Sequence, residues 1–222
     1  MFAACWSVKG GSGTTVVAAA LAVVLARRTD PGALLVDLAG DAPAVLGLSE
    51  PGGPGLAGWF AAGRAVPADG LDRVEVAVAP GLQLVPRGCG ALGPVDRAEV
   101  LAADLAAEGR SVVIDAGVPD WADEAADPAR AALAAAATTS LLVTRPCYLS
   151  LRRIVAAPLQ PTGIVLVVEP GRALDRVDVE QVVGVPVVAE VLVEPAVARV
   201  VDAGLLVGRL PRSLERSLGR AA

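Results

Sequence analysis

A short run near the start of the chain holds the residue types best suited to bind an anion, Lys9-Gly10-Gly11-Ser12-Gly13-Thr14-Thr15. Glycine backbones can curl so that successive N–H groups point at one anion, and the positive end of a following helix adds to the attraction. An apolar strand is expected before the run and a helix, Val16 to Arg28, after it. This order predicts a phosphate-binding loop, formed by Gly10, Gly11, Ser12, Gly13, Thr14 and Thr15, in which the Thr15 hydroxyl would hold Mg²⁺.

The lysine content of the loop is unusual. The common phosphate-binding pattern ends in Gly-Lys-Ser/Thr, whereas this chain has Thr14 in the lysine position. Lys9, at the start of the loop, is the only lysine among 222 residues, and every other basic residue is arginine. A compact ammonium on a flexible stem suits a phosphate in a tight loop. The sequence therefore favours a role for Lys9 at the phosphate over a chance surface lysine.

Two predicted buried strands each end in an aspartate, Ala33 to Asp37 and Ser111 to Asp115. Apolar runs without alternation are typical of parallel strands covered on both faces. The carboxyl ends of such strands meet at one edge of a sheet, where ligands bind. We therefore expect Asp115 to hold Mg²⁺ through water, opposite Thr15. The alternative is that Asp115 caps the segment that follows it.

The rest of the chain alternates strands and helices. Further strands are predicted at 74–78, 82–85, 140–144, 163–168 and 186–191, and helices at 43–48, 56–63, 94–108, 130–137, from about 149, 177–183, 195–202 and 210–220. The acidic segment from Pro119 to Pro128 is expected to be a solvated loop. This alternation predicts the α/β class: a three-layer α/β/α sandwich of P-loop NTPase type, with a mostly parallel central sheet, in a single domain over residues 1–222.

Composition excludes several classes of function. Three scattered cysteines and the absence of histidine argue against a disulfide framework, a zinc site and histidine-based catalysis. A net charge of −5 does not favour nucleic-acid binding by the whole surface. The start lacks the basic region of a signal peptide, and the apolar run from Val16 to Ala26 is too short to span a bilayer. A cytoplasmic location is the simplest expectation.

The end of the chain is predicted to be an amphipathic helix with a basic face. Leu210, Leu214 and Leu218 recur at helical spacing, among several arginines. The leucines can pack on the domain, or the helix can contact a membrane surface, which would make the protein peripheral there. Three leucines bury too little to hold a membrane alone, so the second alternative would need a dimer or a partner.

The loop of residues 9–15 resembles the deviant Walker A motif, KGGxGK[ST], of the ParA/MinD family of P-loop ATPases. Val36-Asp37 is similar to the end of that family's Walker A′ strand, and Val113-Ile114-Asp115 resembles its Walker B strand. Later segments follow in the family's order. The loop, with Thr14 in place of the second lysine, resembles the degenerate loops of the CpaE/TadZ and septum-site-determining-like branch.

The resemblance implies a homodimer that encloses two nucleotides, ATP or ADP with Mg²⁺. The residue matched by Lys9 reaches the partner subunit's phosphates, and the residue matched by Asp37 helps to position the attacking water. Such dimers position other machinery, which implies a protein partner in a pilus, secretion or cell-division system. Nucleic acid is a weaker expectation, because phosphate contacts need a dense basic surface.

Three hypotheses for the function follow. The absence of a charge at position 14 would cost on the order of 1.5–3 kcal/mol of phosphate binding. The first hypothesis is therefore a nucleotide-binding positioning protein that is at most a weak ATPase. The second is an active dimeric ATPase switch in which Lys9 acts in trans. The third is an interaction scaffold that has lost nucleotide.

Overall fold

The computed structural model describes residues 1–63, 66–67, 69–120 and 127–221. Strands from all parts of this range form one eight-stranded sheet, in the order β3-β4-β2-β5-β1-β6-β7-β8. β3 and β4 pair antiparallel, and every other pairing in the sheet is parallel. The strands are β1 Phe2–Trp6, β2 Ala33–Asp37, β3 Val76–Ala79, β4 Leu82–Val85, β5 Ser111–Gly117, β6 Thr139–Thr144, β7 Gly163–Val168 and β8 Val187–Leu192.

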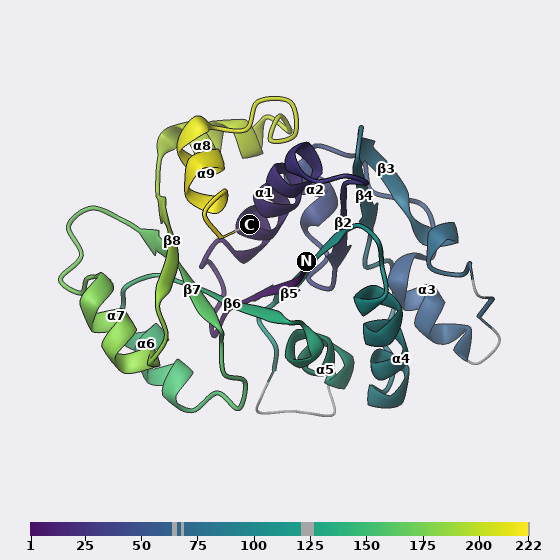
Figure 1. The fold of residues 1–222 in the computed structure, drawn as a ribbon, viewed down its shortest axis with the longest axis horizontal. Coiled ribbons are helices and arrows are strands. Elements are labelled where there is room, and N and C mark those ends of the chain that lie inside the picture. Colours follow the sequence, from purple (N-terminus) through teal and green to yellow (C-terminus); the bar gives the residue numbers. More distant parts are fainter. Residues whose placement is uncertain (64–65, 68, 121–126, 222) are drawn as a thin grey trace.

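Helices cover both faces of this sheet, which confirms the predicted α/β/α sandwich (Figure 1). α1, α2, α8 and α9 pack on one face, and α3 to α7 pack on the other. Side chains alternate between the two cores along each strand: Trp6 belongs to one core and its neighbour Cys5 to the other. The helices are α1 Thr14–Arg28, α2 Ala42–Leu46, α3 Gly55–Ala61, α4 Val95–Ala106, α5 Pro128–Ala136, α6 Tyr148–Val155, α7 Arg176–Val183, α8 Pro195–Asp202 and α9 Arg212–Leu218.

The strand order places the candidate residues at one edge of the sheet. β5 lies between β2 and β1, so the loops that follow these three strands are neighbours. In the register of the pairs, Asp115 is opposite both Asp37 of β2 and Cys5 of β1. The loop of residues 9–15 begins shortly after Cys5. The two aspartates and the glycine loop therefore meet, as the sequence predicts.

Most observed elements begin and end within about two residues of their predicted bounds, and two segments need separate comment. The strand predicted at 74–78 begins only at Val76, because the preceding residues, Asp72–Val74, form a 3₁₀ turn. In this turn the Val74 and Glu75 amides donate to the carbonyls of Leu71 and Asp72. In the acidic segment predicted as a loop, residues 121–126 lie outside the described residues, and Pro128 already begins α5.

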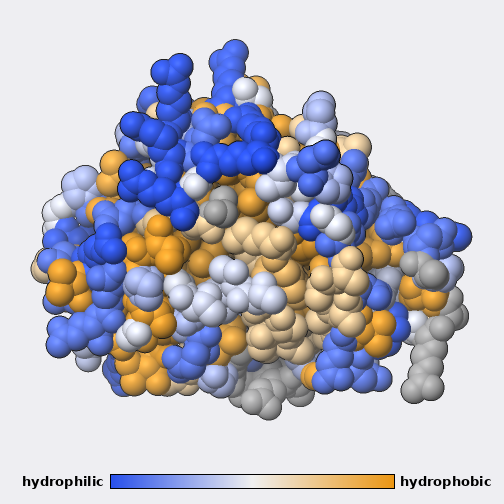
Figure 2. Space-filling model, viewed as in Figure 1, coloured by the Kyte–Doolittle hydropathy of each residue, from blue (hydrophilic) through white to orange (hydrophobic). Residues whose placement is uncertain are grey.

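The C-terminal helix α9 packs on the domain. Leu210, Leu214 and Leu218 are all buried in the core that contains α1, so the first of the two alternatives for these leucines is the one observed. The arginines remain outside, and Figure 2 shows strongly hydrophilic residues gathered over α8 and α9 at the top of the view. Within the described part of the chain, no helix combines the length and apolarity that a membrane span requires.

Candidate functional site

The glycine loop between β1 and α1 forms an open cradle. Gly11 and Gly13 have φ angles of 73° and 87°, in the left-handed region that favours glycine. A methyl group added at Gly10, Gly11 or Gly13 would meet no atom within 4 Å, so this backbone faces open space. The loop lines a cavity of about 570 Å³, and α1 starts at Thr14 with its N-terminus at this cavity. Loop amides and a helix N-terminus together suit a phosphate.

Two buried serines support the loop through hydrogen bonds. The Ser7 and Ser12 hydroxyl oxygens lie 2.8 Å apart, and each lies 3.0 Å from the Lys9 carbonyl oxygen. The predicted role of Ser12 in binding thus falls to its backbone, since its hydroxyl is directed into the loop. Sequence reasoning missed Ser7, because one serine at the end of an apolar strand carries no motif.

The two threonines and Lys9 occupy different parts of the site. Thr14 is buried at the first position of α1, where the common motif has lysine, and Thr15 follows it at the cavity. Lys9 is half-buried, and its ammonium donates to the carbonyl of the adjacent Gly10 at 3.2 Å in a solvent-exposed bond. Its side chain therefore lies at the edge of the cavity.

Asp115 has one carboxylate oxygen that nothing in the described chain satisfies. It is fully buried; Oδ1 accepts the Gly117 amide at 3.1 Å, and Oδ2 is left without a hydrogen-bond partner. Burial raises the pKa of Asp115 to about 7, and the nearby Asp37 adds to this, whereas the Thr15 hydroxyl, the Gly117 amide and the Arg130 charge lower it. The alternative role of Asp115, as a cap of the segment that follows it, would explain only the hydrogen bond accepted by Oδ1. An unpartnered carboxylate oxygen beside Thr15 fits the chemistry of a hydrated Mg²⁺.

Asp37 holds the loop that follows β2. Its Oδ1 accepts the Gly40 amide at 2.7 Å and its Oδ2 accepts the Ala42 amide at 3.1 Å. Burial raises the pKa of Asp37, and these amides oppose the shift. The effect of this anchoring is to place Ala39 and Asp41 at the cavity. The role of Asp37 in positioning water stays a prediction.

One basic residue of the cavity was missed by sequence reasoning. Arg130 of α5 lines the cavity beside the glycine loop. Its Nη2 donates to the Leu38 carbonyl at 2.9 Å, and its Nε lies 3.0 Å from the Asp127 carboxylate. An alanine-rich helix gives no local signal for such a position, because its relation to the loop depends on how α5 packs.

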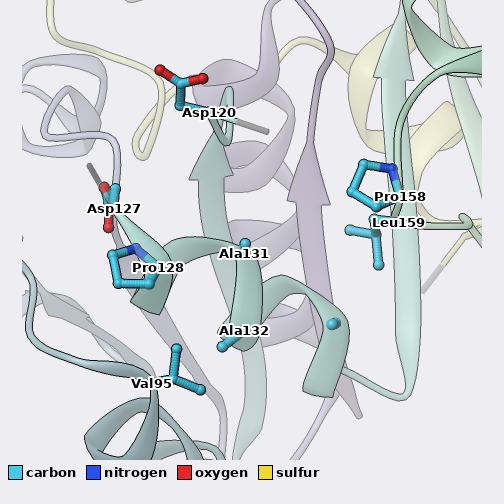
Figure 3. Close-up of a pocket in the computed structure, with 9 residues that line it drawn as sticks. Val95, Asp120, Asp127, Pro128, Ala131, Ala132, Pro158 and Leu159 are labelled. Atoms are coloured by element: carbon cyan, nitrogen blue, oxygen red, sulfur yellow. The ribbon is translucent and has the colours of Figure 1, made fainter. Parts of the chain in front are cut away.

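Two further hollows flank this cavity. A hollow of about 190 Å³ is lined by valines of α1, β7, β8 and α8 among other residues, shares Gly13 and Val16 with the cavity at the glycine loop, and has Arg145 at its edge. A third hollow, of about 320 Å³, lies along the side of α5 that carries Ala131 and Ala132 (Figure 3). Figure 3 also shows Asp127 and Pro128 at the start of α5, where the ion pair with Arg130 forms. The valine-rich hollow adjoins the N-terminus of α1, so it is the one placed to extend the phosphate cradle.

The glycine loop between β1 and α1, set in a mostly parallel sheet, defines a P-loop protein of the α/β class. Residues 2–169 match the family described as cellulose biosynthesis protein BcsQ, and the chain belongs to this ParA/MinD-like family. No curated protein sequence matches the chain significantly. The finer resemblance to the CpaE/TadZ branch stays a prediction.

Solved structures share the fold along the whole chain. A ParA family ATPase from Chlorobium tepidum TLS is 18% identical, with a TM-score of 0.74, over 97% of this chain and 94% of that one. The MinD cell division protein of Aquifex aeolicus is 16% identical, with a TM-score of 0.76, over 100% and 95%. The septum site-determining protein MinD of Pyrococcus horikoshii OT3, solved with Mg-ADP, is 17% identical, with a TM-score of 0.75, over 99% and 93%.

Proposed function

We propose that this protein binds ATP or ADP with Mg²⁺ at the loop of residues 9–15 and uses the bound nucleotide to position another assembly. The observation that carries the proposal is the open glycine cradle next to Asp115, whose Oδ2 has no hydrogen-bond partner among the described residues. Support also comes from similar structures whose titles name a nucleotide: MinD with Mg-ADP, and a Cyanothece McdA variant with ATP.

Each part of the cavity has a place in this proposal. The loop amides and the N-terminus of α1 would hold the phosphates, and Thr15 with Asp115 would hold Mg²⁺, which neutralises phosphate charge when bound. The valine-rich hollow beside Gly13 would take the apolar face of the base. Residues 38–42, anchored by Asp37, would close the cavity on the side of β2.

The proposed working form is a homodimer with weak or no turnover. Thr14 supplies a hydroxyl but no charge, so the subunit by itself stabilises a developing phosphate charge poorly. The alternative is the second hypothesis, an ATPase in which Lys9 acts on the nucleotide of the partner subunit, because in its own subunit the Lys9 ammonium bonds only to the exposed Gly10 carbonyl among the described residues. Both forms would work in the cytoplasm, where nucleotide is available.

The proposed partner is a protein of a pilus, secretion or cell-division apparatus. The family description adds a further candidate, an assembly that makes cellulose. A MinC:MinD complex from Aquifex aeolicus is a precedent for a protein partner on this fold. Copurification with the partner, tested with and without Mg-ATP, would measure whether nucleotide controls the interaction.

Thermal-shift titration tests the binding proposal directly. Saturation with Mg-ATP or Mg-ADP at about 100 times the dissociation constant should add about 2.7 kcal/mol of stability, or roughly 5–10 °C. Thr15→Val keeps the side-chain shape and removes the hydroxyl, so its Mg-dependent shift should fall. If wild type shows no shift at millimolar nucleotide, only the scaffold hypothesis survives.

Phosphate release separates the first two hypotheses. A turnover by wild type that Lys9→Ala abolishes and Lys9→Arg partly retains would establish the ATPase with Lys9 in trans. Nucleotide binding by the isolated Lys9→Ala subunit should remain, because the proposed contact of Lys9 is with the nucleotide of the partner subunit and its ammonium bonds to the Gly10 carbonyl in its own subunit.

A further inference from the structure

The proposed nucleotide site lacks a charge that its ligand requires. A polyphosphate carries several negative charges, and Thr14 stands where the common motif supplies a lysine. Lys9 bonds to its own Gly10 carbonyl at the edge of the cavity. Among the described side chains that line the cavity, Lys9, Asp41 and Arg130 are charged, with Asp37 and Asp115 buried beneath. Among these described side chains, Arg130 is therefore the basic group that reaches the cavity from outside the glycine loop.

Arg130 is held at the carboxyl edge of the sheet by two loops. Its Nη2 donates to the Leu38 carbonyl after β2 at 2.9 Å, and its Nη1 makes a long contact of 3.4 Å with the Val118 carbonyl after β5. The same Nη1 would lie 3.5 Å from a methyl group added at Gly117. Gly117 in turn accepts the Ser7 amide at 2.8 Å, at the start of the glycine loop. The guanidinium thus lies beside Gly117, which is hydrogen-bonded to the start of the glycine loop.

The guanidinium keeps donors for a ligand. It carries N–H groups on three nitrogens in a planar fork, and only the bond to Leu38 is short. Asp127 lies beside Nε, and Nη1 and Nη2 each carry a second N–H group beyond their contacts with the Val118 and Leu38 carbonyls, in a side chain that lines the cavity. The side chain is only 16% exposed. A charge this well screened from water interacts more strongly with a phosphate than an exposed one does.

The valine-rich hollow and Arg130 together indicate how a bound nucleotide would be oriented. The valine-rich hollow lies toward β7 and β8, whereas Arg130 bonds to the loops after β2 and β5. In the sheet, β7 and β8 lie on one side of β1, and β2 and β5 lie on the other. A nucleotide with its base in the hollow would extend its phosphates over the glycine loop toward Arg130, so the last phosphate would come nearest to the guanidinium.

We infer that Arg130 contacts the terminal phosphate of the nucleotide in its own subunit and supplies the positive charge that Thr14 lacks. This inference rests on the proposed function. The competing role is structural: Arg130 would do no more than hold the Leu38 loop. Arg87 provides the comparison, because its Nε donates to the same Leu38 carbonyl at 3.1 Å, although Arg87 does not line the cavity.

The test is equilibrium binding of fluorescent ATP and ADP analogues, with Mg²⁺, to a set of variants of the full chain. Arg130→Gln should weaken ATP binding about 10- to 150-fold, the loss expected for one charge-assisted contact, and ADP binding less. Arg130→Lys should retain part of the affinity. Arg87→Gln should stay within about threefold of wild type. Thr14→Lys combined with Arg130→Gln should restore most of the ATP affinity, because the charge returns by another route.

The outcomes separate the inference from the function. If wild type binds neither nucleotide, the proposed function falls and the inference falls with it. If wild type binds and Arg130→Gln binds equally well, the inference alone is overturned. Equal losses of ATP affinity in Arg87→Gln and Arg130→Gln would show that Arg130 only holds the Leu38 loop. If Thr14→Lys fails to restore ATP affinity to the Arg130→Gln variant, the inference is also overturned. Melting temperatures check folding; should Arg130→Gln not fold, Arg130→Met removes the charge while keeping an apolar stem.

Discussion

Replacement of Asp115 by asparagine should raise stability and abolish Mg²⁺-dependent nucleotide binding. The ionised carboxylate is fully buried, and its Oδ2 has no hydrogen-bond partner in the part of the chain that the structure describes, whereas the unfolded chain exposes it to water. Burial raises the pKa of Asp115 from 3.8 to about 7. A difference of about 3 pH units corresponds to roughly 4 kcal/mol at alkaline pH. Asparagine keeps the bond from the Gly117 amide but brings an amide that needs an acceptor, so we expect about half of this gain, roughly 2 kcal/mol.

The pH dependence of this effect has a definite sign. The folded pKa lies above the unfolded one, so the ionised group destabilises the metal-free protein above about pH 7. The penalty disappears as the pH falls from about 7 toward 4. Burial raises the pKa of Asp37 in the same direction, but that contribution is present in both proteins. The difference between wild type and Asp115→Asn therefore isolates Asp115.

The assay is thermal unfolding between pH 5 and pH 8.5, in EDTA and then with Mg-ATP. In EDTA at pH 8, Asp115→Asn should melt roughly 4–8 °C above wild type, and near pH 5 the gap should close. With Mg-ATP, wild type should gain stability and the variant should not. Asp104→Asn, at an exposed position of α4 away from the cavity, serves as the control. A lower melting temperature for Asp115→Asn in EDTA at pH 8 would refute the buried-charge reasoning, and an undiminished Mg-ATP shift would refute the metal role.

Three further perturbations address the loop and the C-terminal helix. Thr14→Lys should raise ATP affinity about 10- to 150-fold by titration, and an unchanged affinity would contradict the account of the loop. Gly13→Ala should cost about 1–2 kcal/mol in denaturant unfolding and weaken nucleotide binding, because its φ of 87° strains any residue with a Cβ; wild-type stability would argue that the loop is not held in this form. Leu214→Ala should cost about 2–5 kcal/mol, whereas Arg216→Ser on the exposed side of α9 should change stability by less than about 0.5 kcal/mol. A stability unchanged by Leu214→Ala would show that α9 does not dock as described.

The sequence by itself determined the features that depend on neighbours along the chain. The spacing of glycines in residues 9–15 predicts the loop, because left-handed backbone and a helix N-terminus are local properties. Uninterrupted apolar runs predict strands such as Ala33–Asp37 and Gly163–Val168 with their observed bounds. Strand–helix alternation then predicts the parallel sheet, and with it the meeting of Asp37, Asp115 and the loop at one edge.

Only the tertiary structure decided how the charges and hydroxyls of the site are used. Arg130 reaches the Leu38 carbonyl across 92 residues of chain, and nothing within its alanine-rich helix indicates that partner. The sequence likewise could not show that both oxygens of Asp37 accept backbone amides while Oδ2 of Asp115 accepts none. Hydrogen bonding and burial depend on which elements pack together, and packing joins residues that are distant in sequence.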